Sequence, residues 1–307
     1  MIKRRNILFT ILTIGLALLL SGCKLALLDP QGPIAASEKQ LLIDATLLML
    51  IIVIPVILIS WAFAWRYRAS NKKATYRPDE AHNNVIEFFC WLVPCIIIIV
   101  LGIMTWRSSH ELDPYKPLDS KVPPITIQVI SLDWKWLFIY PDQHIATINF
   151  LEIPVNTPIQ FLITSDAPMN SLEIPQLAGQ VYSMGGMQTK LHIMANTLGD
   201  YMGLSTNISG EGFSDMNFVI RVTTKEQFDQ WVKTVQHTPN KLTVAVYNKL
   251  TLPTIKDPVA YYSDVAPNLF HDVIMKFMMP MPDLDVQNDG TSNDAASETL
   301  KLGHKNV

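Results

Sequence analysis

Three long runs of apolar residues dominate the first hundred or so residues of the chain, and the pattern changes after them. The first run spans residues 7–20, the second about 41–65 and the third about 86–106. The second and third runs are each long enough to cross a hydrocarbon core of roughly 30 Å as a helix of about 20 residues. The chain is therefore expected to begin with membrane-embedded segments, and a single water-soluble globule is excluded.

Short stretches of alternating apolar and polar residues follow, from about residue 122 to residue 222. The pattern recurs in four segments, 125–130, 158–164, 191–194 and 218–222. Turn-forming groups such as Asn156-Thr157-Pro158 separate these segments. Several short strands at this spacing predict a β-sandwich or barrel of about a hundred residues.

Helical periodicity returns after the predicted strands. Phe228, Trp231, Val232 and Val235 recur at helical spacing within residues 224–236, where Thr223 or Thr224 is placed to cap the start. A second helix is predicted at residues 268–278, so residues 223–280 form a C-terminal helical region. Residues 281–307 are polar and poor in aromatic residues, a composition that predicts a disordered tail.

The N-terminus has the features of an export signal. Lys3, Arg4 and Arg5 precede the first apolar run, which ends in Leu20-Ser21-Gly22-Cys23 and resembles the lipobox of bacterial lipoproteins. The resemblance implies that residues 1–22 are a signal peptide and that Cys23 becomes the lipidated N-terminus of an outer-face segment, residues 23–40. The alternative is an ordinary first membrane span with a chance cysteine.

The charges between the second and third runs give the orientation of a transmembrane hairpin at residues 41–106. The short loop carries five cations, Arg66, Arg68, Lys72, Lys73 and Arg77. By the positive-inside rule this loop is cytoplasmic. Cys23 and everything after about residue 107 are then on the outer side, which agrees with a lipid-anchored N-terminus.

Composition narrows the functional classes. Charged residues make up 17% of the chain, the net charge is −3, and there are only three cysteines, at positions 23, 90 and 95. A disulfide scaffold and a basic nucleic-acid binder are excluded. The chain also has no nucleophile constellation, phosphate loop or clustered acid pair, so a self-sufficient enzyme is not expected. Cys90 and Cys95 are interpreted as inert packing residues.

Glu87 is the one acidic residue near the start of the third run. A carboxylate inside a membrane helix is a functional hypothesis by default, because it is costly to place there. The alternative is a headgroup-level residue that reaches water beside Asn83 and Asn84.

Two segments of the outer domain carry a family resemblance. They are Asp133-Trp134-Lys135-Trp136-Leu137-Phe138-Ile139-Tyr140-Pro141 and the stretch from Gly203 through Ser205, Asn207 and Ser209 to Met216. Together with the two-span hairpin they resemble subunit II of the haem-copper oxidases, over roughly residues 23–280. The resemblance implies a membrane-anchored α+β protein, in which the hairpin is followed by a cupredoxin-like β-sandwich at residues 107–222 and by the C-terminal helical region.

In this family the cytochrome c oxidases hold a dinuclear copper centre in the outer domain. Its ligands are two thiolates, two imidazoles, a thioether and a backbone carbonyl. In the motif C-x-E-x-C-x-x-x-H-x-x-M the corresponding residues of this chain are Ser205, Asn207, Ser209, Phe213 and Met216. Asn170 occupies the position of the upstream histidine. Only Met216 retains its side chain, and serine is a poor substitute for the soft thiolate that suits copper. We therefore expect no metal on this chain, as in the quinol oxidases of the family.

The resemblance implies subunit II of a proton-translocating quinol oxidase in a bacterial inner membrane. The haems and the reactive copper would lie in subunit I, where oxygen is reduced to water, so this chain would carry no cofactor of its own. Its partners would be subunit I, other oxidase subunits, membrane lipid and, through the complex, the quinol pool, with no nucleic acid. Glu87 matches a residue that the family places at the cytoplasmic mouth of a proton pathway.

Two other functions remain open at this point. One is a cytochrome c oxidase subunit with an active outer copper centre, which the missing thiolates oppose. The other is a lipid-anchored outer-face binding or assembly protein with a cupredoxin-like fold and no redox role.

Other groups in the outer domain have structural interpretations. No pair among the seven histidines (His82, His110, His144, His192, His237, His271 and His304) has H-x-x-H or H-x-x-x-H spacing. The methionines are expected in the sandwich core (Met184, Met187, Met194, Met202 and Met216). Trp134 and Trp136 are predicted to face the same side of one strand and to pack against the partner subunit.

Overall fold

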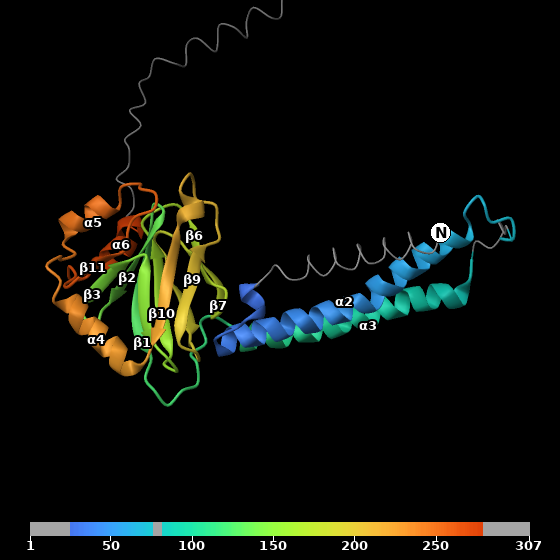
Figure 1. Ribbon diagram of the computed structural model, residues 1–307, viewed down its shortest axis with the longest axis horizontal. Helices are drawn as coiled ribbons and strands as arrows, with labels where there is room; N and C mark the ends of the chain where they lie inside the picture. Colours follow the sequence, from blue (N-terminus) through green and yellow to red (C-terminus); the bar gives the residue numbers. More distant parts are fainter. Residues whose placement is uncertain (1–24, 76–81, 279–307) are drawn as a thin grey trace, which may run out of the picture.

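The computed structural model describes residues 25–75 and 82–278, so Cys23 and the predicted tail at 281–307 lie outside the described residues. A short helix η1 (Ala26–Leu28) precedes two long helices, α2 (Pro33–Arg66) and α3 (Asn84–Glu111). Both are long and apolar enough to cross a membrane. Figure 1 shows them as a hairpin that extends away from a β-sandwich.

The ends of the two long helices follow from local sequence. Pro33 occupies the first turn of α2, where a missing N–H costs nothing and the fixed φ suits a helix. The helix therefore begins eight positions before the apolar run at residue 41. At α3 the Asn83 side chain accepts hydrogen bonds from the backbone N–H groups of Val85 and Ile86, which is an N-cap.

The outer domain consists of two packed sheets. The strands are β1 (Ile125–Leu132), β2 (Lys135–Tyr140), β3 (Ile145–Ile148), β4 (Phe150–Pro154), β5 (Ile159–Ser165), β6 (Asn170–Ile174), β7 (Ala178–Ser183), β8 (Thr189–Ile193), β9 (Gly199–Ser205), β10 (Asn217–Thr223) and β11 (Ala260–Tyr262). The first sheet has the order β11-β3-β2-β1-β5-β8 and the second β4-β10-β9-β6-β7. The β1–β5 and β10–β4 pairs are parallel, and the other named pairs are antiparallel.

Between β10 and residue 278, three helices complete the domain. They are α4 (Lys225–Gln236), α5 (Val244–Leu250) and α6 (Leu269–Met278). Thr224 and Gln227 form a capping box at the start of α4. Helices α4 and α6 confirm the two predicted helices, whereas α5 and strand β11 were not predicted.

Two hydrophobic clusters explain why every residue of β2 is buried. The larger one lies between the sheets and includes Trp136, Phe138 and Phe218. The smaller one lies on the other face of the first sheet, where Leu137 and Ile139 join residues of α5 and α6. The first sheet is thus covered on both faces, in agreement with the position of α5 and α6 in Figure 1.

The segment before the membrane hairpin is docked against the sandwich. The Gln31 backbone N–H donates to the Gln176 carbonyl at 2.7 Å, and its carbonyl accepts from the Asn196 N–H at 2.8 Å. A Cβ on Gly32 would lie 2.4 Å from the Met194 carbonyl oxygen, so only glycine fits there. These contacts join α2 to the side of the sandwich near β7 (Figure 1).

Two expectations for side chains were wrong. Trp136 is fully buried in the core, so it cannot pack against a partner subunit. Trp134 is not on a strand: it lies in the turn between β1 and β2 with a φ of 62°. Of the five methionines assigned to the core only Met216 is buried; Met202, for example, is 60% exposed, because it points away from the neighbouring sheet.

Candidate functional site

Two strands bring together Asn170 and Ser205, two of the positions that match copper ligands in the family motif. Asn170 begins β6 and Ser205 ends β9, and these strands pair in the second sheet. The Ser205 hydroxyl donates to the Asn170 side-chain carbonyl at 3.1 Å, and both residues are buried. The Ser205 backbone N–H donates to the Met216 carbonyl at 3.2 Å. Asn170, Ser205 and Met216 therefore lie close together at one end of the second sheet.

The remaining motif positions lie on the loop of residues 206–216, here named the site loop. The Asn207 side-chain amide donates to the Met169 carbonyl at 2.6 Å. Phe213 begins a short helix η2 (Phe213–Asp215), and Met216 is buried at its end. The Ser209 hydroxyl is buried and has no hydrogen-bond partner among the described residues.

Trp134 packs against this loop from the β1–β2 turn. Its indole N–H donates to the Ser209 carbonyl at 3.4 Å. A Cβ added to Gly212 would lie 2.5 Å from the indole ring, and one added to Gly210 would lie 3.0 Å from it. The ring therefore packs directly on the loop backbone at two glycines.

A cluster of buried hydroxyl groups lies next to the Asn170 amide, and no pattern in the sequence indicates it. The Ser131 hydroxyl donates to Ser165 at 2.7 Å and accepts from Ser183 at 3.1 Å. The Asn170 amide also points at Ser131, at 3.5 Å. Serine in a strand usually faces solvent, so this cluster becomes visible only when β1, β5 and β7 are placed together.

These residues do not fit a dinuclear copper centre. The motif positions offer hydroxyl, amide, phenyl and thioether groups, with no thiolate and no imidazole. Neutral hydroxyl and amide oxygens are poor ligands for copper, which selects thiolate and imidazole. The Asn170 and Ser205 side chains already satisfy each other by a hydrogen bond. Among the described residues no group of three His, Cys, Asp or Glu side chains is placed to hold a metal ion.

His192, the buried histidine of the domain, has a structural role. It is 4% exposed, and its Nδ1 lies 2.9 Å from the Pro114 carbonyl. This contact fastens the linker that follows α3 to strand β8.

Glu87 lies at the other end of the molecule, in the first turn of α3. Its side chain is 53% exposed, and its Oε1 lies 3.3 Å from Nδ1 of His82. Negative charge is favoured at a helix N-terminus. The structure therefore separates two features, a carboxylate at the loop end of the hairpin and a neutral polar site in the outer domain.

Comparison with known proteins gives the same architecture. Sequence profiles of three families match the chain: the transmembrane domain of cytochrome c oxidase subunit II at residues 22–107, its periplasmic domain at residues 143–223, and the COX aromatic rich motif at residues 236–281.

Three curated relatives are similar over most of their length. Subunit 2 of the cytochrome bo(3) ubiquinol oxidase of Pseudomonas aeruginosa is 53% identical over 266 residues, which cover 87% of this chain and 80% of the relative. Ubiquinol oxidase subunit 2 of Acetobacter aceti is 48% identical over 263 residues, or 85% of each chain. Quinol oxidase subunit 2 of Bacillus cereus is 40% identical over 257 residues, or 83% of this chain and 88% of the relative.

The resemblance inferred from the sequence is thereby confirmed. The two apolar helices and the match to a periplasmic domain fit an inner-membrane protein. The chain belongs to the family of subunit 2 of the cytochrome bo(3) ubiquinol oxidases, and so to a quinol oxidase complex.

Proposed function

We propose that this chain is a redox-inactive subunit of the oxidase, which carries no dinuclear copper in its outer domain. The observation that supports this most directly is the hydrogen bond between Ser205 and Asn170, two neutral side chains at motif positions of thiolate and imidazole ligands. Electrons would then pass from quinol to haems and copper in subunit I without a relay through this chain.

Metal analysis of the purified complex tests this proposal. We expect one copper per complex, from the reactive centre of subunit I, and no near-infrared absorption of a mixed-valence dinuclear copper. Two additional copper atoms per complex, together with that absorption, would contradict the proposal. The measurement uses the intact complex, so it does not depend on the outer domain folding alone.

The chain's second proposed role is proton uptake at Glu87. The side chain lies in the first turn of α3, which follows the cationic loop in the sequence, and it contacts a titratable group, His82. A carboxylate with access to water at a membrane helix end can collect a proton and pass it on. The loop charges favour a cytoplasmic location for this end of the hairpin, the side from which the oxidase would take up protons.

Substitution of Glu87 in the assembled oxidase tests this role. We expect Glu87→Ala and Glu87→Gln to lower turnover about tenfold, which corresponds to about 1.4 kcal/mol in the barrier, without loss of assembly. Glu87→Asp should retain most of the activity. Glu111→Gln, at the opposite end of the same helix, is a matched control that should leave turnover unchanged. Full turnover of an assembled Glu87→Gln complex would exclude the role.

The third part of the proposal is a lipid anchor at Cys23 after removal of residues 1–22. Residues 29–35 dock against the outer domain, and the six residue-to-residue steps from Cys23 to Asp29 span at most about 22 Å. This reach supports a location of Cys23 on the outer-domain side of a bacterial inner membrane. Mass spectrometry of the mature N-terminus should find an acylated Cys23, and a chain that begins at Met1 would exclude it.

A further inference from the structure

The part of the chain from Leu242 to Met278, which contains α5, β11 and α6, contacts the sandwich through three ion pairs. We name it the C-terminal brace. Its partners on the sandwich are Lys135, Asp166 and Asp215. Asp215 lies in the site loop, and Asp166 lies in the turn that leads into β6. Lys135 directly follows Trp134, which packs on the site loop.

The first contact is built around a buried cation. Lys135 is 1% exposed, and its Nζ lies 2.9 Å from Oδ2 of Asp257 and 3.0 Å from the Leu252 carbonyl; it also donates to the Thr254 hydroxyl. A buried ammonium group requires such partners because it has lost its hydration. Lys135 directly follows Trp134, whose ring packs on Gly210 and Gly212 of the site loop. The contacts of Lys135 therefore also restrain the neighbouring Trp134, which packs on the site loop.

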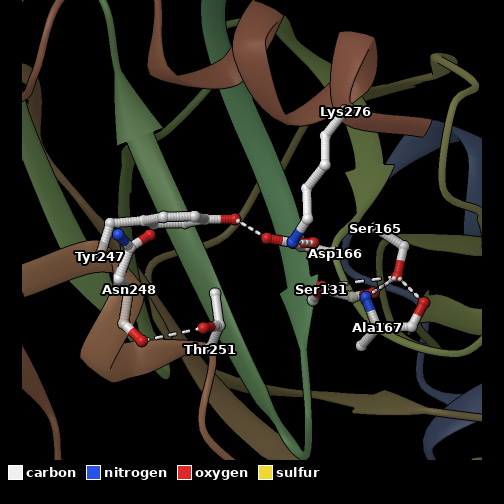
Figure 2. Close-up of polar contacts among 8 residues, drawn as sticks. All are labelled: Ser131, Ser165, Asp166, Ala167, Tyr247, Asn248, Thr251 and Lys276. Carbon is white, nitrogen blue, oxygen red and sulfur yellow. Dashed lines mark hydrogen bonds and ion pairs between the residues drawn. The ribbon is translucent and has the colours of Figure 1, made fainter. Parts of the chain in front are cut away.

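The second contact is built around a buried anion. The Asp166 side chain is 1% exposed, and Figure 2 shows Tyr247 from α5 and Lys276 from α6 both reaching it. The Tyr247 hydroxyl donates to one carboxylate oxygen at 2.8 Å, and the Lys276 ammonium group lies 2.6 Å from the other. Burial raises the pKa of Tyr247, which keeps its hydroxyl protonated as a donor. Asp166 directly follows Ser165, whose hydroxyl accepts a hydrogen bond from Ser131. Ser131 in turn accepts from the Asn170 amide, and Asn170 accepts from Ser205.

The third contact reaches the site loop itself. Lys256 of the brace lies 3.4 Å from Asp215 in the short helix η2. One contact thus reaches the site loop directly, and the other two are linked to it or to Asn170 through Trp134 and through the Ser165–Ser131 pair. A metal ion bound at such a site links loops from different strands, and its binding free energy contributes to folding.

We propose that the C-terminal brace immobilises the site loop and the neighbouring motif positions, and so performs the mechanical task of a metal ion. The inference rests on the proposal that no copper binds here. Without a metal, the conformational entropy lost by ordering eleven loop residues must be offset by other contacts. The brace supplies such contacts, because its residues Asp257, Lys276 and Lys256 pair with Lys135, Asp166 and Asp215.

Hydrogen–deuterium exchange of the intact oxidase tests this role. The amides of Phe213, Asp215 and Met216 donate to backbone carbonyls within the site loop, so their exchange reports on its opening. We expect Asp257→Asn and Lys276→Met each to accelerate exchange at residues 206–216 about tenfold, as expected when a local opening becomes easier. Asp200→Asn is the matched control, since it breaks the exposed Asp200–Arg221 pair at the far end of β9.

The outcomes are distinguishable from those of the copper measurement. Unchanged exchange at residues 206–216, in variants whose brace helices exchange faster, would overturn the inference even if the complex lacks the additional copper. Equal acceleration by Asp200→Asn would overturn it as well. Should Asp257→Asn fail to accumulate, Lys256→Met removes an exposed side chain and breaks only the contact to Asp215. It should accelerate exchange at residues 213–216, and no change there would again overturn the inference.

Discussion

The Ser205 hydroxyl donates a hydrogen bond to the Asn170 side-chain carbonyl at 3.1 Å, across the pairing of β9 with β6. Both side chains are buried, and neither is charged. Burying a polar group without a partner is costly, so this pair stabilises the end of the second sheet while leaving it unsuited to copper. Because the backbone already places these two side chains in contact, the ability of the site to bind a metal depends mainly on which residues occupy the two positions.

Restoring the ligand types should therefore restore copper binding. We expect the combination Asn170→His, Ser205→Cys, Asn207→Glu, Ser209→Cys and Phe213→His to bind copper, because the loop retains Met216 and the close approach of β6 to β9. Optical absorption and copper content of the purified chain measure this. The same combination without the Ser205 and Ser209 changes is the control, and it should bind no copper. A folded five-fold variant that takes up none would contradict the assignment of these positions.

Removing the buried cation of β2 should strongly destabilise the outer domain. In Lys135→Met the Asp257 carboxylate and two oxygen acceptors lose their partner. We expect a loss of about 3 kcal/mol, the lower end for a broken buried pair because Asp257 keeps some solvent access. Thermal unfolding of the purified chain should show a Tm lower by about 6–12 °C.

A double variant shows whether the missing partner causes this loss. Lys135→Met with Asp257→Leu removes both charges, and it should recover part of the Tm. A Lys135→Met protein with an unchanged Tm would show that the pair contributes nothing.

Gly32 should be intolerant of any side chain. A Cβ there would lie 2.4 Å from the Met194 carbonyl and 3.2 Å from the Leu177 carbonyl, and both are backbone atoms that cannot rotate away. We expect Gly32→Val to separate residues 29–35 from the sandwich and to accelerate exchange of the Asn196 amide, which donates to the Gln31 carbonyl. Gly102→Ala, in α3, is the control, because a Cβ there meets no atom within 4 Å apart from the neighbouring residues and the backbone of its own helix turn. Equal protection of Asn196 in both variants would contradict the expected docking.

Glu152 should make the stability of the outer domain fall as pH rises. Its burial raises its pKa above the ordinary value of 4.5, against the opposing effects of Thr223 and Arg221. The folded state therefore holds the proton more tightly than the unfolded state. This contribution is present below pH 4.5 and is lost as pH rises through the raised pKa. Glu152→Gln should raise the Tm by about 1–3 °C at pH 7–8 and leave it nearly unchanged at pH 4.

Asp200 provides the opposite case. The hydrogen bond from Arg221 lowers the pKa of Asp200 below its ordinary value of 3.8. Its contribution is present above that value and is lost as pH falls through the lowered pKa. Asp200→Asn should therefore lower the Tm at pH 7, and its effect should shrink in acid. The same sign for both variants at pH 7 would contradict this assignment of the two shifts.

Helices α4 and α6 and several strands were predictable because their burial is one-sided. Helix α4 buries Phe228, Val232 and Val235 at helical spacing, and β10 alternates exposed and buried positions. Strand β2 gave a misleading signal because sheet and helices cover both of its faces, so its six residues are buried without alternation. Trp136 therefore lies in the core.

The rest of the site depends on contacts between segments distant in sequence. Lys135 and Asp257 meet only after the brace has folded onto β2, and no local pattern marks a buried lysine. Trp134 adopts a φ of 62°, which an alternating strand pattern does not predict. The hydroxyl cluster at Ser131 likewise requires three strands to be placed together.

Strand β11 also affects how the protein is made. Tyr262 pairs with Ala146 at the edge of the first sheet, so the ribosome synthesises more than a hundred intervening residues before that edge is covered. Until then β3 presents unpaired N–H and C=O groups, the kind of edge that promotes aggregation. A nascent outer domain thus remains vulnerable late in its synthesis, and a premature stop codon before residue 260 would leave that edge permanently open.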